Sequence, residues 1–462
     1  DRLPPGLYHD EAFNGLDAVQ VLGGRWPLFF EANNGREPLF IYLTAVAVAI
    51  WGRSPGALRC VAALVGTLLL PATYLLGRSL YGRREGAIAA LLAATTVWTL
   101  NLSRVALRAG LLPLGSALSL TLLWRGLRDR RPWSMVWAGA LYGLTFYTYL
   151  AARFSPIALL FFMIYTLIWR RDWFWARGWA LFGLSALLVV APLAGYLLWH
   201  WDSTLGRADQ VAIWNPAISG GDVWGTLARQ AWRTLLAPFV RGDFIPRHNI
   251  PLRPVFDPLM ALATLGGTAV AVARARKSPA NVLVLVWLGA MALPTVLAEG
   301  APHMLRAVGL LPVLLLLPAA GLGAASRWLA NRGERARRVT HAALALLLAA
   351  SATSNVMAYW RHLHSEAVYY NFEAGATQLA VEANRFLGAG WQGEGLVVPA
   401  NAPASDRNVY LATRLWQNWA SVRYLVPESD AVHVLDTTTS TADLGDGEVL
   451  VLLWPYEEPE IA

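Results

Sequence analysis

Residues 57–76 read ALRCVAALVGTLLLPATYLL, a stretch of twenty residues with a single charge, and GRSLYGRR follows directly at 77–84. A helix needs roughly 17–25 mostly apolar residues to cross a bilayer, so the first stretch predicts a membrane span. Arg residues just beyond a span favour the cytoplasmic side of the membrane. An apolar run that ends in a basic connection therefore predicts both a span and its orientation.

The same alternation recurs along the chain. It predicts ten spans, at 57–76, 86–100, 109–124, 133–150, 154–169, 178–199, 258–273, 281–298, 307–325 and 339–358. Five connections between them carry 18 of the 38 Lys and Arg residues, whereas those at 101–108, 151–153 and 299–306 carry four in all. We expect the strongly basic connections to be cytoplasmic and the others to be extracytoplasmic. The net charge of +8 is then explained by topology, and no nucleic-acid partner is expected.

Composition agrees with a polytopic membrane protein. Hydrophobic residues make up 56% of the 462 residues and charged residues 15%, against about 25% charged in a typical soluble domain. The single cysteine, Cys60, excludes an internal disulfide framework, a Cys-rich zinc site and a Cys-ligated iron–sulfur cluster. The sequence has no P-loop, dinucleotide fingerprint or HExxH motif, so ATP-driven transport and nicotinamide redox chemistry have no support.

Three hydrophilic regions fall on the predicted extracytoplasmic side: residues 1–54, residues 200–256 and the tail from 359. They hold 24 of the 30 acidic residues, which fits an outward-facing site. Residue 1 is Asp and lies on the outer side in this topology. We therefore expect a preceding apolar helix, which would give eleven spans in the full protein.

The tail differs from the rest in pattern. It predicts helices at 366–387 and 407–420 and strands at 395–399 and 447–454, and so a small extracytoplasmic α/β domain over 359–462. The fold class expected is mainly α: a polytopic helical bundle over 1–358, followed by this domain.

Two adjacent carboxylates, Asp10 and Glu11, stand just before an amphipathic stretch at 12–22. A carboxylate near a membrane surface acts as a general base when a low dielectric raises its pKa towards neutrality. Acidic residues also stabilise helix N-termini. Capping of the following helix therefore stays open as the alternative role of this pair.

A second motif, NNGREPL at 33–39, precedes an apolar helix predicted at 39–51. Gly, two charges and Pro suit a sharp turn at the bilayer interface. Arg36 would meet a lipid phosphate there, with Glu37 orienting it or the acceptor. An ordinary turn with a solvated ion pair explains the motif equally well.

Further basic residues recur on short connections of the outer side. Arg104 and Arg108 are four residues apart and would share a helix face, as a clamp for a phosphate or pyrophosphate. The alternative is that both side chains snorkel to lipid headgroups. His303 and Arg306 recur in the connection 299–306 and are candidates for the same phosphate.

Other candidates lie near the predicted membrane boundaries. Glu299 and Asp257 are ionisable groups near membrane depth, where function is the default hypothesis, although Asp257 directly precedes Pro258 and suits a helix cap. Several aromatic residues line a cavity or form an interfacial belt, of which the belt is the commoner arrangement. They are Tyr142, Tyr147, Tyr149, Trp199 and Trp201.

Taken in order, these motifs resemble a known family. His9-Asp10-Glu11 at the outer start is followed by Gly35-Arg36-Glu37-Pro38, Ser103-Arg104 and His303-x-x-Arg306. The order and the shared outer location are similar to those of the C-type (GT-C) membrane glycosyltransferases of family 39. This superfamily includes the protein O-mannosyltransferases and the lipid A aminoarabinose transferases. The similarity covers residues 5–325.

The resemblance implies a GT-C fold and an inverting transfer of a sugar from a polyprenyl phosphate. It implies that Asp10 is the catalytic carboxylate, with Glu11 beside it, and that Glu37 and Pro38 lie near the donor phosphate. Some members have a second essential Asp in the next outer loop, where this chain is basic at 104–108. A divalent metal is therefore unsupported, the cofactor stays undefined, and Arg104 and Arg108 would neutralise the phosphate instead.

The leading hypothesis is therefore a multi-pass glycosyltransferase of the cell membrane with its site on the extracytoplasmic side. Asp10 would be the general base, and the acceptor a protein, a lipid or a glycan. The donor phosphate would be bound by Arg36, Glu37, Arg104, Arg108, His303 and Arg306. The alternative is a non-catalytic GT-C-like scaffold or accessory subunit that binds lipid or a partner. A transporter has less support, because paired interrupted spans are not seen.

Overall fold

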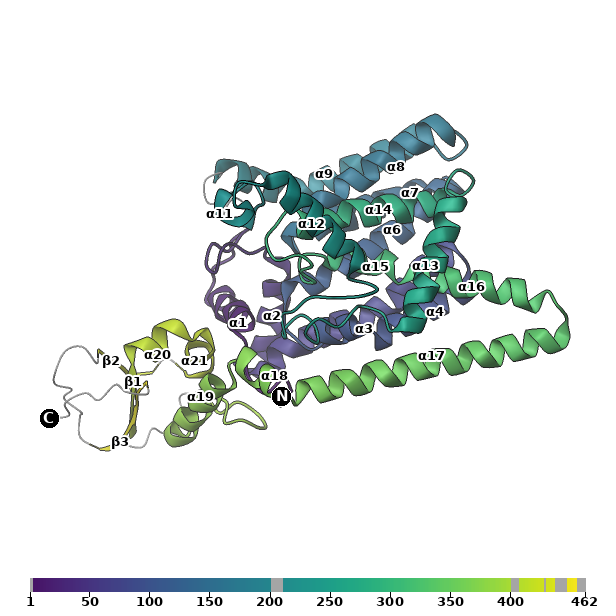
Figure 1. The fold of residues 1–462 in the computed structure, drawn as a ribbon. Helices are drawn as coiled ribbons and strands as arrows, with labels where there is room; N and C mark the ends of the chain where they lie inside the picture. The colour runs from purple at the N-terminus through teal and green to yellow at the C-terminus, as the bar shows by residue number, and fades with distance from the viewer. Residues whose placement is uncertain (1–2, 201–210, 400–406, 428, 437–446, 455–462) are drawn as a thin grey trace.

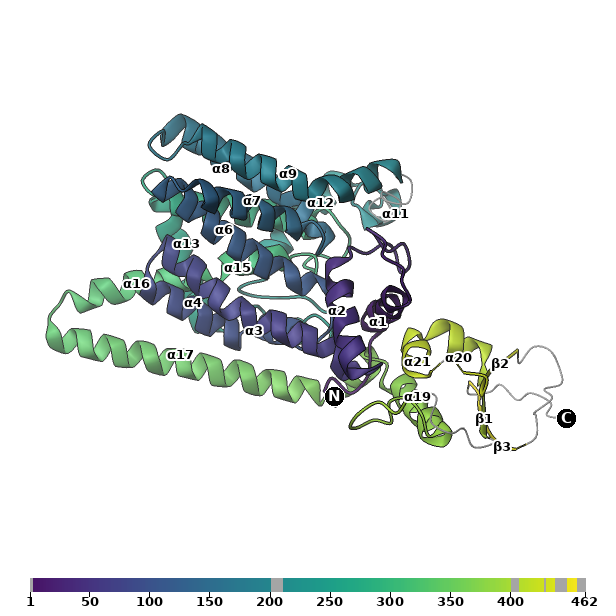
Figure 2. The same cartoon turned by 180° about the vertical axis from the view of Figure 1, so that it is seen from behind.

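The computed structural model describes residues 3–200, 211–399, 407–427, 429–436 and 447–454. It shows a bundle of long helices with a small sheet-containing domain attached at one end (Figure 1). The view from behind shows the same two parts, with the long helix α17 along one side of the bundle (Figure 2). The prediction of a mainly α, polytopic bundle followed by a small α/β domain is confirmed.

Most elements of the bundle follow one another with short connections, and the longer connections lie between α1 and α2, between α9 and α13 and between α14 and η3. They are α1 (His9–Leu22), α2 (Leu39–Trp51), α3 (Pro55–Leu80), α4 (Arg83–Thr95), α5 (Val97–Leu102), η1 (Arg108–Gly110), α6 (Leu111–Asp129), α7 (Pro132–Thr145), η2 (Leu150–Phe154), α8 (Ser155–Trp169), α9 (Ala176–Trp199), α11 (Pro216–Ser219), α12 (Val223–Leu236), α13 (Pro258–Ala273), α14 (Pro279–Val296), η3 (Val308–Leu310), α15 (Leu311–Leu314), α16 (Leu316–Ala330) and α17 (Glu334–Leu363).

Seven helical segments of the described chain are long and apolar enough to cross a membrane, and each overlaps a predicted span. They are Pro55–Leu80, Arg108–Asp129, Leu150–Trp169, Ala176–Trp199, Pro279–Val296, Val308–Ala330 and Glu334–Leu363. The other three predicted spans fall on shorter helices. Of these, α7 has 14 residues and α13 has 16, and the predicted span 86–100 is divided between α4 and α5 at Thr96, whose backbone is extended.

Local signals account for where many helices begin. A Pro in the first turn opens α3, α7, α8, α13 and α14, where its missing N–H group is not needed. Asp257 Oδ1 accepts hydrogen bonds from the backbone N–H groups of Leu259 and Met260, both at 3.1 Å. The capping role favoured for Asp257 is therefore confirmed.

Glycines allow the closest helix contacts in the bundle. A Cβ atom at Gly267 of α13 would overlap the Leu317 carbonyl oxygen of α16, and one at Gly321 of α16 would overlap the Ala263 carbonyl oxygen of α13. Small residues let two backbones approach in this way, and membrane helices use them because lipid gives no hydrophobic drive for association. This pair fixes the position of α16, from which α17 folds back (Figure 1).

The two ends of the bundle differ. The turns that join α6 to α7, α8 to α9 and α16 to α17 gather at one end (Figures 1 and 2). The opposite end, here called the α1 end, carries α1, α11 and the C-terminal domain. The basic connections and the hydrophilic regions are thus separated as expected. That the α1 end is extracytoplasmic stays a prediction, which rests on the distribution of Arg.

The C-terminal domain is built on a parallel three-stranded sheet of order β2-β1-β3. Its elements are α18 (Glu366–Asn371), α19 (Ala374–Leu387), β1 (Arg407–Ala412), α20 (Thr413–Asn418), α21 (Ala420–Leu425), β2 (Val432–Leu435) and β3 (Glu448–Leu452). Helix α17 runs to Leu363, past the boundary predicted at 358. Helix α21 packs on α1, and a Cβ atom at Gly15 of α1 would lie 2.5 Å from Cε2 of Tyr424.

Three details of the tail differ from the prediction. Residues 407–412 form the central strand rather than a helix. Residues 409–412 are all buried there, and a short apolar run of this kind fits a buried strand as well as a helix. The helix predicted at 366–387 is broken where Glu373 adopts φ +56°. The strand predicted at 395–399 is reduced to one bridge between Val398 and Gly390, whereas β3 falls within the strand predicted at 447–454.

Candidate active site

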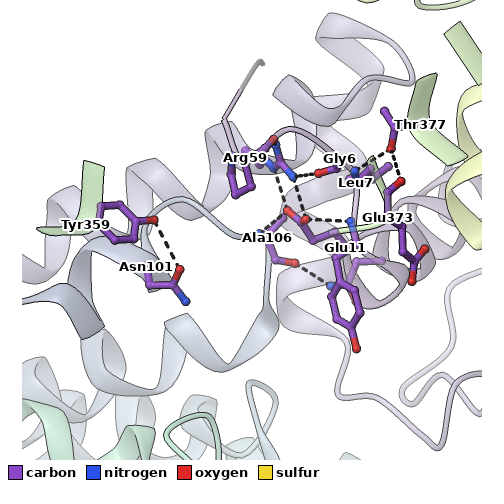
Figure 3. A network of polar contacts seen from close by, with 12 residues as sticks. Gly6, Leu7, Glu11, Arg59, Asn101, Ala106, Tyr359, Glu373 and Thr377 are labelled. Carbon is purple, nitrogen blue, oxygen red and sulfur yellow. Dashed lines mark hydrogen bonds and ion pairs between the residues drawn. The ribbon is translucent and has the colours of Figure 1, made fainter. Parts of the chain in front are cut away.

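The two adjacent carboxylates of α1, Asp10 and Glu11, have different surroundings. Glu11 is fully buried, and its two oxygens pair with the guanidinium of Arg59 at 3.0 and 2.9 Å (Figure 3). It also accepts hydrogen bonds from the backbone N–H groups of Ala106, at 2.8 Å, and Tyr8, at 3.2 Å. Because every lone pair is engaged within protein, Glu11 ties the start of α1 to α3 and to the segment before η1. Glu11 therefore has a structural role, which includes the capping of α1 left open above, and these contacts do not support the predicted catalytic role.

Asp10 faces a cavity. It is half-buried, and its Oδ1 accepts a hydrogen bond of 2.7 Å from Asn33 Nδ2. The cavity has a volume of about 80 Å³ and is lined by Asp10, Asn14, Asn33, Arg36, Leu107, Arg108, Ala109, Tyr149 and Leu305. One carboxylate oxygen is thus oriented by an amide, in a small polar cavity that includes two guanidinium groups.

Arg36 is buried at the wall of this cavity. It is paired with Asp17 of α1 and donates hydrogen bonds of 3.2 Å to Asn14 Oδ1 and to the Ala32 carbonyl. Burial outweighs the ion pair, since it lowers the pKa of Arg36 to about 10 and raises the pKa of Asp17 to about 6. Arg36 therefore fixes the turn at 33–38 against α1. Because its guanidinium is already paired with Asp17, only part of its charge is available to a ligand.

Glu37 lies between two guanidinium groups. Its buried side chain is 3.4 Å from Arg108 and 3.6 Å from Arg153, measured between Oε and Nη atoms. Arg108 also donates a hydrogen bond of 3.0 Å to the Gly35 carbonyl. Arg153 belongs to η2, so Glu37 connects the first hydrophilic region to two later connections of the chain.

These residues line a second, larger cavity of about 330 Å³. Its basic residues are Arg108, Arg153 and Arg306, and much of the remaining wall is apolar, including Phe29, Leu150, Phe154, Val211 and Leu297. Arg108 and Tyr149 line both cavities. The guanidinium of Arg108 is 5.6 Å from the ring centroid of Tyr149, so this pair stands where the two cavities adjoin.

Arg104 does not join Arg108. Helix α5 ends at Leu102, and Leu107 is extended and buried, so the two Arg residues do not share a helix face. Arg104 is exposed and lines neither of the two cavities. The predicted clamp of Arg104 with Arg108 is therefore wrong, and Arg153 is the residue beside Arg108.

The two candidates of the connection 299–306, Arg306 and His303, lie in different surroundings. Arg306 lines the larger cavity, donates a hydrogen bond of 2.5 Å to the Glu299 carbonyl and lies 3.6 Å from the Glu299 carboxylate. His303 lines neither of the two cavities, and its ring centroid is 4.7 Å from that of His248. The structure thus brings Arg306, but not His303, to the larger cavity with Arg108 and Arg153.

Among the aromatic candidates that the structure describes, Tyr149 alone lines the two cavities. Tyr142 is buried and shares a hydrogen bond of 2.8 Å with Ser155, and Tyr147 donates one of 2.8 Å to the Val189 carbonyl. Trp199 is 87% exposed, as expected for an interfacial belt. Trp201 lies outside the described residues.

The C-terminal domain reaches the start of α1. Arg247 stacks on Tyr8, with its guanidinium 4.1 Å from the ring centroid, and donates a hydrogen bond of 3.3 Å to Asn371 Oδ1. Glu373 lies beside this cluster, and burial raises its pKa to about 7 although Arg247 opposes the shift. The tail is therefore part of the surroundings of Asp10.

The sequence motifs did not single out Arg153 or the orienting role of Asn33. Arg153 stands on a short outer connection, as Arg104 and Arg108 do, and this shared location was the available signal. Asn33 is part of the NNGREPL motif, but only the packing of that turn on α1 shows that its amide meets Asp10.

Comparison with known proteins agrees with this architecture. Residues 35–199 match the family model described as dolichyl-phosphate-mannose-protein mannosyltransferase. ArnT from Cupriavidus metallidurans, crystallised in the apo state, is similar with a TM-score of 0.54 and 14% identity, over 91% of this chain and 81% of that one. ArnT bound to undecaprenyl phosphate gives 0.52 and 15%, over 91% and 80%.

The oligosaccharyltransferase of Archaeoglobus fulgidus in the apo form is similar with a TM-score of 0.50 and 15% identity, over 91% of this chain and 61% of that one. A search of curated proteins gave no match. The solved structures show that this chain has the GT-C glycosyltransferase fold, which the family model over residues 35–199 supports, and its long apolar helices are those of a multi-pass membrane protein.

Proposed function

We propose that this protein transfers a sugar from a polyprenyl-phosphate donor to an acceptor at the membrane surface. The observation that carries the proposal is the pair of adjoining cavities, one basic and partly apolar, the other containing Asp10. They share Arg108 and Tyr149, so a donor and an acceptor held in the two cavities would meet at these side chains.

The larger cavity suits the donor. Arg108, Arg153 and Arg306 supply guanidinium groups, which bind phosphate oxygens by charge-assisted hydrogen bonds. The apolar part of the wall suits the first units of a prenyl chain. Glu37 holds two of these groups in place before a ligand arrives. Similar solved structures include ArnT bound to undecaprenyl phosphate and AglB in complex with a dolichol-phosphate, which supports this ligand class.

The smaller cavity suits the attacking group. Its wall brings the carboxylate of Asp10 together with the amides of Asn14 and Asn33. The acceptor, whether protein, lipid or glycan, would place its hydroxyl-bearing end there. Asp10 is oriented for this contact by Asn33.

The chemistry is a single displacement with inversion. The acceptor oxygen forms a bond to the anomeric carbon and gives its proton to Asp10, a general base. The bond from that carbon to the phosphate oxygen breaks, and its electron pair leaves with the polyprenyl phosphate. Arg108 and Arg153 offset the charge that develops on the phosphate. No step requires a metal ion.

The test uses the full chain in lipid nanodiscs with a panel of undecaprenyl-phosphate monosaccharides. Release of undecaprenyl phosphate, measured by mass spectrometry, reports turnover. We expect Asp10→Asn to lower turnover by about 10²-fold or more, the contribution of a general base, while undecaprenyl phosphate still binds. The control is Glu366→Gln, at an exposed residue that lines neither of the two cavities.

Full turnover by Asp10→Asn would remove this carboxylate from the reaction. Binding of undecaprenyl phosphate without turnover of any donor by the wild-type protein would favour the non-catalytic scaffold instead. The two outcomes are distinct, because only the second concerns the wild-type protein.

A further inference from the structure

Three metal-ligating side chains meet outside the two cavities. Asp243 and His248 belong to the connection between α12 and α13, and His303 to the connection between α14 and η3. One ligand atom from each lies within 4.8 Å of the others. Within the described ranges this is the one group of three or more His, Cys, Asp or Glu residues with such spacing. Neither the sequence motifs nor the proposed transfer accounts for it.

His248 provides a second, independent observation. Its side chain is only 8% exposed, and its Nδ1 makes no hydrogen bond to any described residue. This nitrogen lies 3.4 Å from Asp243 Oδ2, and the ring centroids of His248 and His303 are 4.7 Å apart. A buried polar atom without a hydrogen bond is costly, and such atoms call for an explanation. A cation between the imidazoles and the carboxylate would satisfy it.

The carboxylate is already held in place. Asp243 Oδ1 accepts a hydrogen bond of 2.9 Å from the Ile245 N–H group, and Oδ2 accepts one of 2.7 Å from the Met304 N–H group. Each oxygen keeps a further lone pair. Outer hydrogen bonds of this kind orient the ligands of metal sites. The bond to Met304 also links the carboxylate to the connection that carries His303.

We propose that Asp243, His248 and His303 bind one zinc ion. Two imidazole nitrogens with one carboxylate oxygen are a donor set typical of zinc. Tetrahedral zinc with ligand distances near 2.0–2.1 Å holds its ligand atoms about 3.4 Å apart. The separation of 3.4 Å between His248 and Asp243 already fits, and closing the group from 4.8 Å requires small side-chain movements.

The ion would join two connections that are far apart in the sequence. Arg306, which lines the larger cavity, lies three residues after His303 on the same connection. Zinc would therefore hold the segment that presents Arg306 to a donor, a consequence that rests on the proposed function. The binding of zinc itself does not depend on that function.

The experiment measures metal in the purified full chain, produced with an affinity tag that contains no histidine. The protein is stripped with a chelator, supplied with ZnCl₂, desalted and analysed by inductively coupled plasma mass spectrometry. We expect close to one zinc per chain in the wild type, and a loss of about tenfold in His248→Gln and in His303→Gln. The control His364→Gln, at an exposed histidine, should keep its zinc.

Cobalt provides a readout that does not depend on how well a variant is recovered. Co²⁺ added to the stripped wild-type protein should give the visible absorption of a tetrahedral site with nitrogen and oxygen ligands, and ZnCl₂ should remove it. Substoichiometric zinc in the wild type, or stoichiometric zinc in both Gln variants, would overturn the proposal. None of these measurements uses the turnover of a donor. A result against zinc binding is therefore separate from a result against the proposed glycosyl transfer.

Discussion

Arg108 is the residue at which the two cavities meet. It pairs with Glu37, lies against Tyr149 and lines both cavities, whereas Arg104 is exposed. Charge-assisted hydrogen bonds contribute about 1.5–3 kcal/mol. We therefore expect Arg108→Ala to weaken binding of undecaprenyl phosphate by about 10- to 100-fold, and Arg104→Ala, its matched control, to leave it unchanged. Binding is measured by native mass spectrometry of the protein in nanodiscs, and equal effects of the two changes would place the phosphate elsewhere.

Glu373 makes stability depend on pH. Burial raises its pKa from the ordinary 4.5 to about 7, so the folded protein holds a proton that the unfolded chain releases. Stability from this group is complete below about pH 4.5 and is lost as the pH rises through about 7. We expect Glu373→Gln to flatten the fall in Tm between pH 5 and pH 8, measured by scanning fluorimetry. Glu366→Gln, at an exposed carboxylate of the same domain, should keep the wild-type slope, and an unchanged slope in Glu373→Gln would contradict the assignment.

Asp10 and Glu11 show which structural details a sequence motif does not predict. Successive residues of a helix point about 100° apart, since 3.6 residues complete a turn. Once α1 packs against α3, Glu11 faces Arg59 and Asp10 faces the cavity. The motif left open whether the pair serves chemistry or caps the helix. The packing places Glu11 in the capping box and in the ion pair with Arg59, and it leaves Asp10 at the cavity, where its catalytic role stays a prediction.

At the scale of elements, the contact of α1 with α21 attaches the C-terminal domain to the bundle. Gly15 lies against the buried ring of Tyr424, and an added Cβ atom would overlap it. Ala is ordinarily the better helix former, by about 1 kcal/mol. Here we expect Gly15→Ala to lower Tm and to speed proteolysis of the tail, because the ring has no room to move.

The control for this prediction is Gly375→Ala in α19, where a Cβ atom would meet nothing within 4 Å. That change should be neutral or stabilising. If Gly15→Ala behaved in the same way, α21 would not pack on α1 as described.

The elements also differ in how well local pattern predicts them. Long apolar helices such as α3 and α9 were predicted closely, because burial in lipid requires only a continuous apolar stretch. The strand β1 was predicted as part of a helix. Its apolar residues are buried by β2, β3 and the surrounding helices, and short apolar runs do not distinguish a buried strand from a helix.

The orientation of the protein in the membrane can be tested by cysteine labelling, because the chain has a single cysteine, Cys60. In a Cys60→Ser background, we expect Glu366→Cys to react with a membrane-impermeant maleimide on intact cells, since it lies at the α1 end. We expect Asn331→Cys, between α16 and α17, to react only after lysis. Labelling is read by a gel shift. The reverse pattern would invert the topology that the Arg residues predict.

The apolar helices, their order and the separation of basic connections from hydrophilic regions can be predicted from the amino-acid sequence alone. These properties follow from the transfer of each segment into lipid, which depends on that segment alone. Which candidates line the adjoining cavities depends on how the helices pack. Glu11, Arg104 and His303 do not line them, whereas five other residues do: Asp10, Asn33, Arg108, Arg153 and Arg306. The reason is that a site needs the directions of side chains from distant segments, and helix packing sets those directions after each helix has formed.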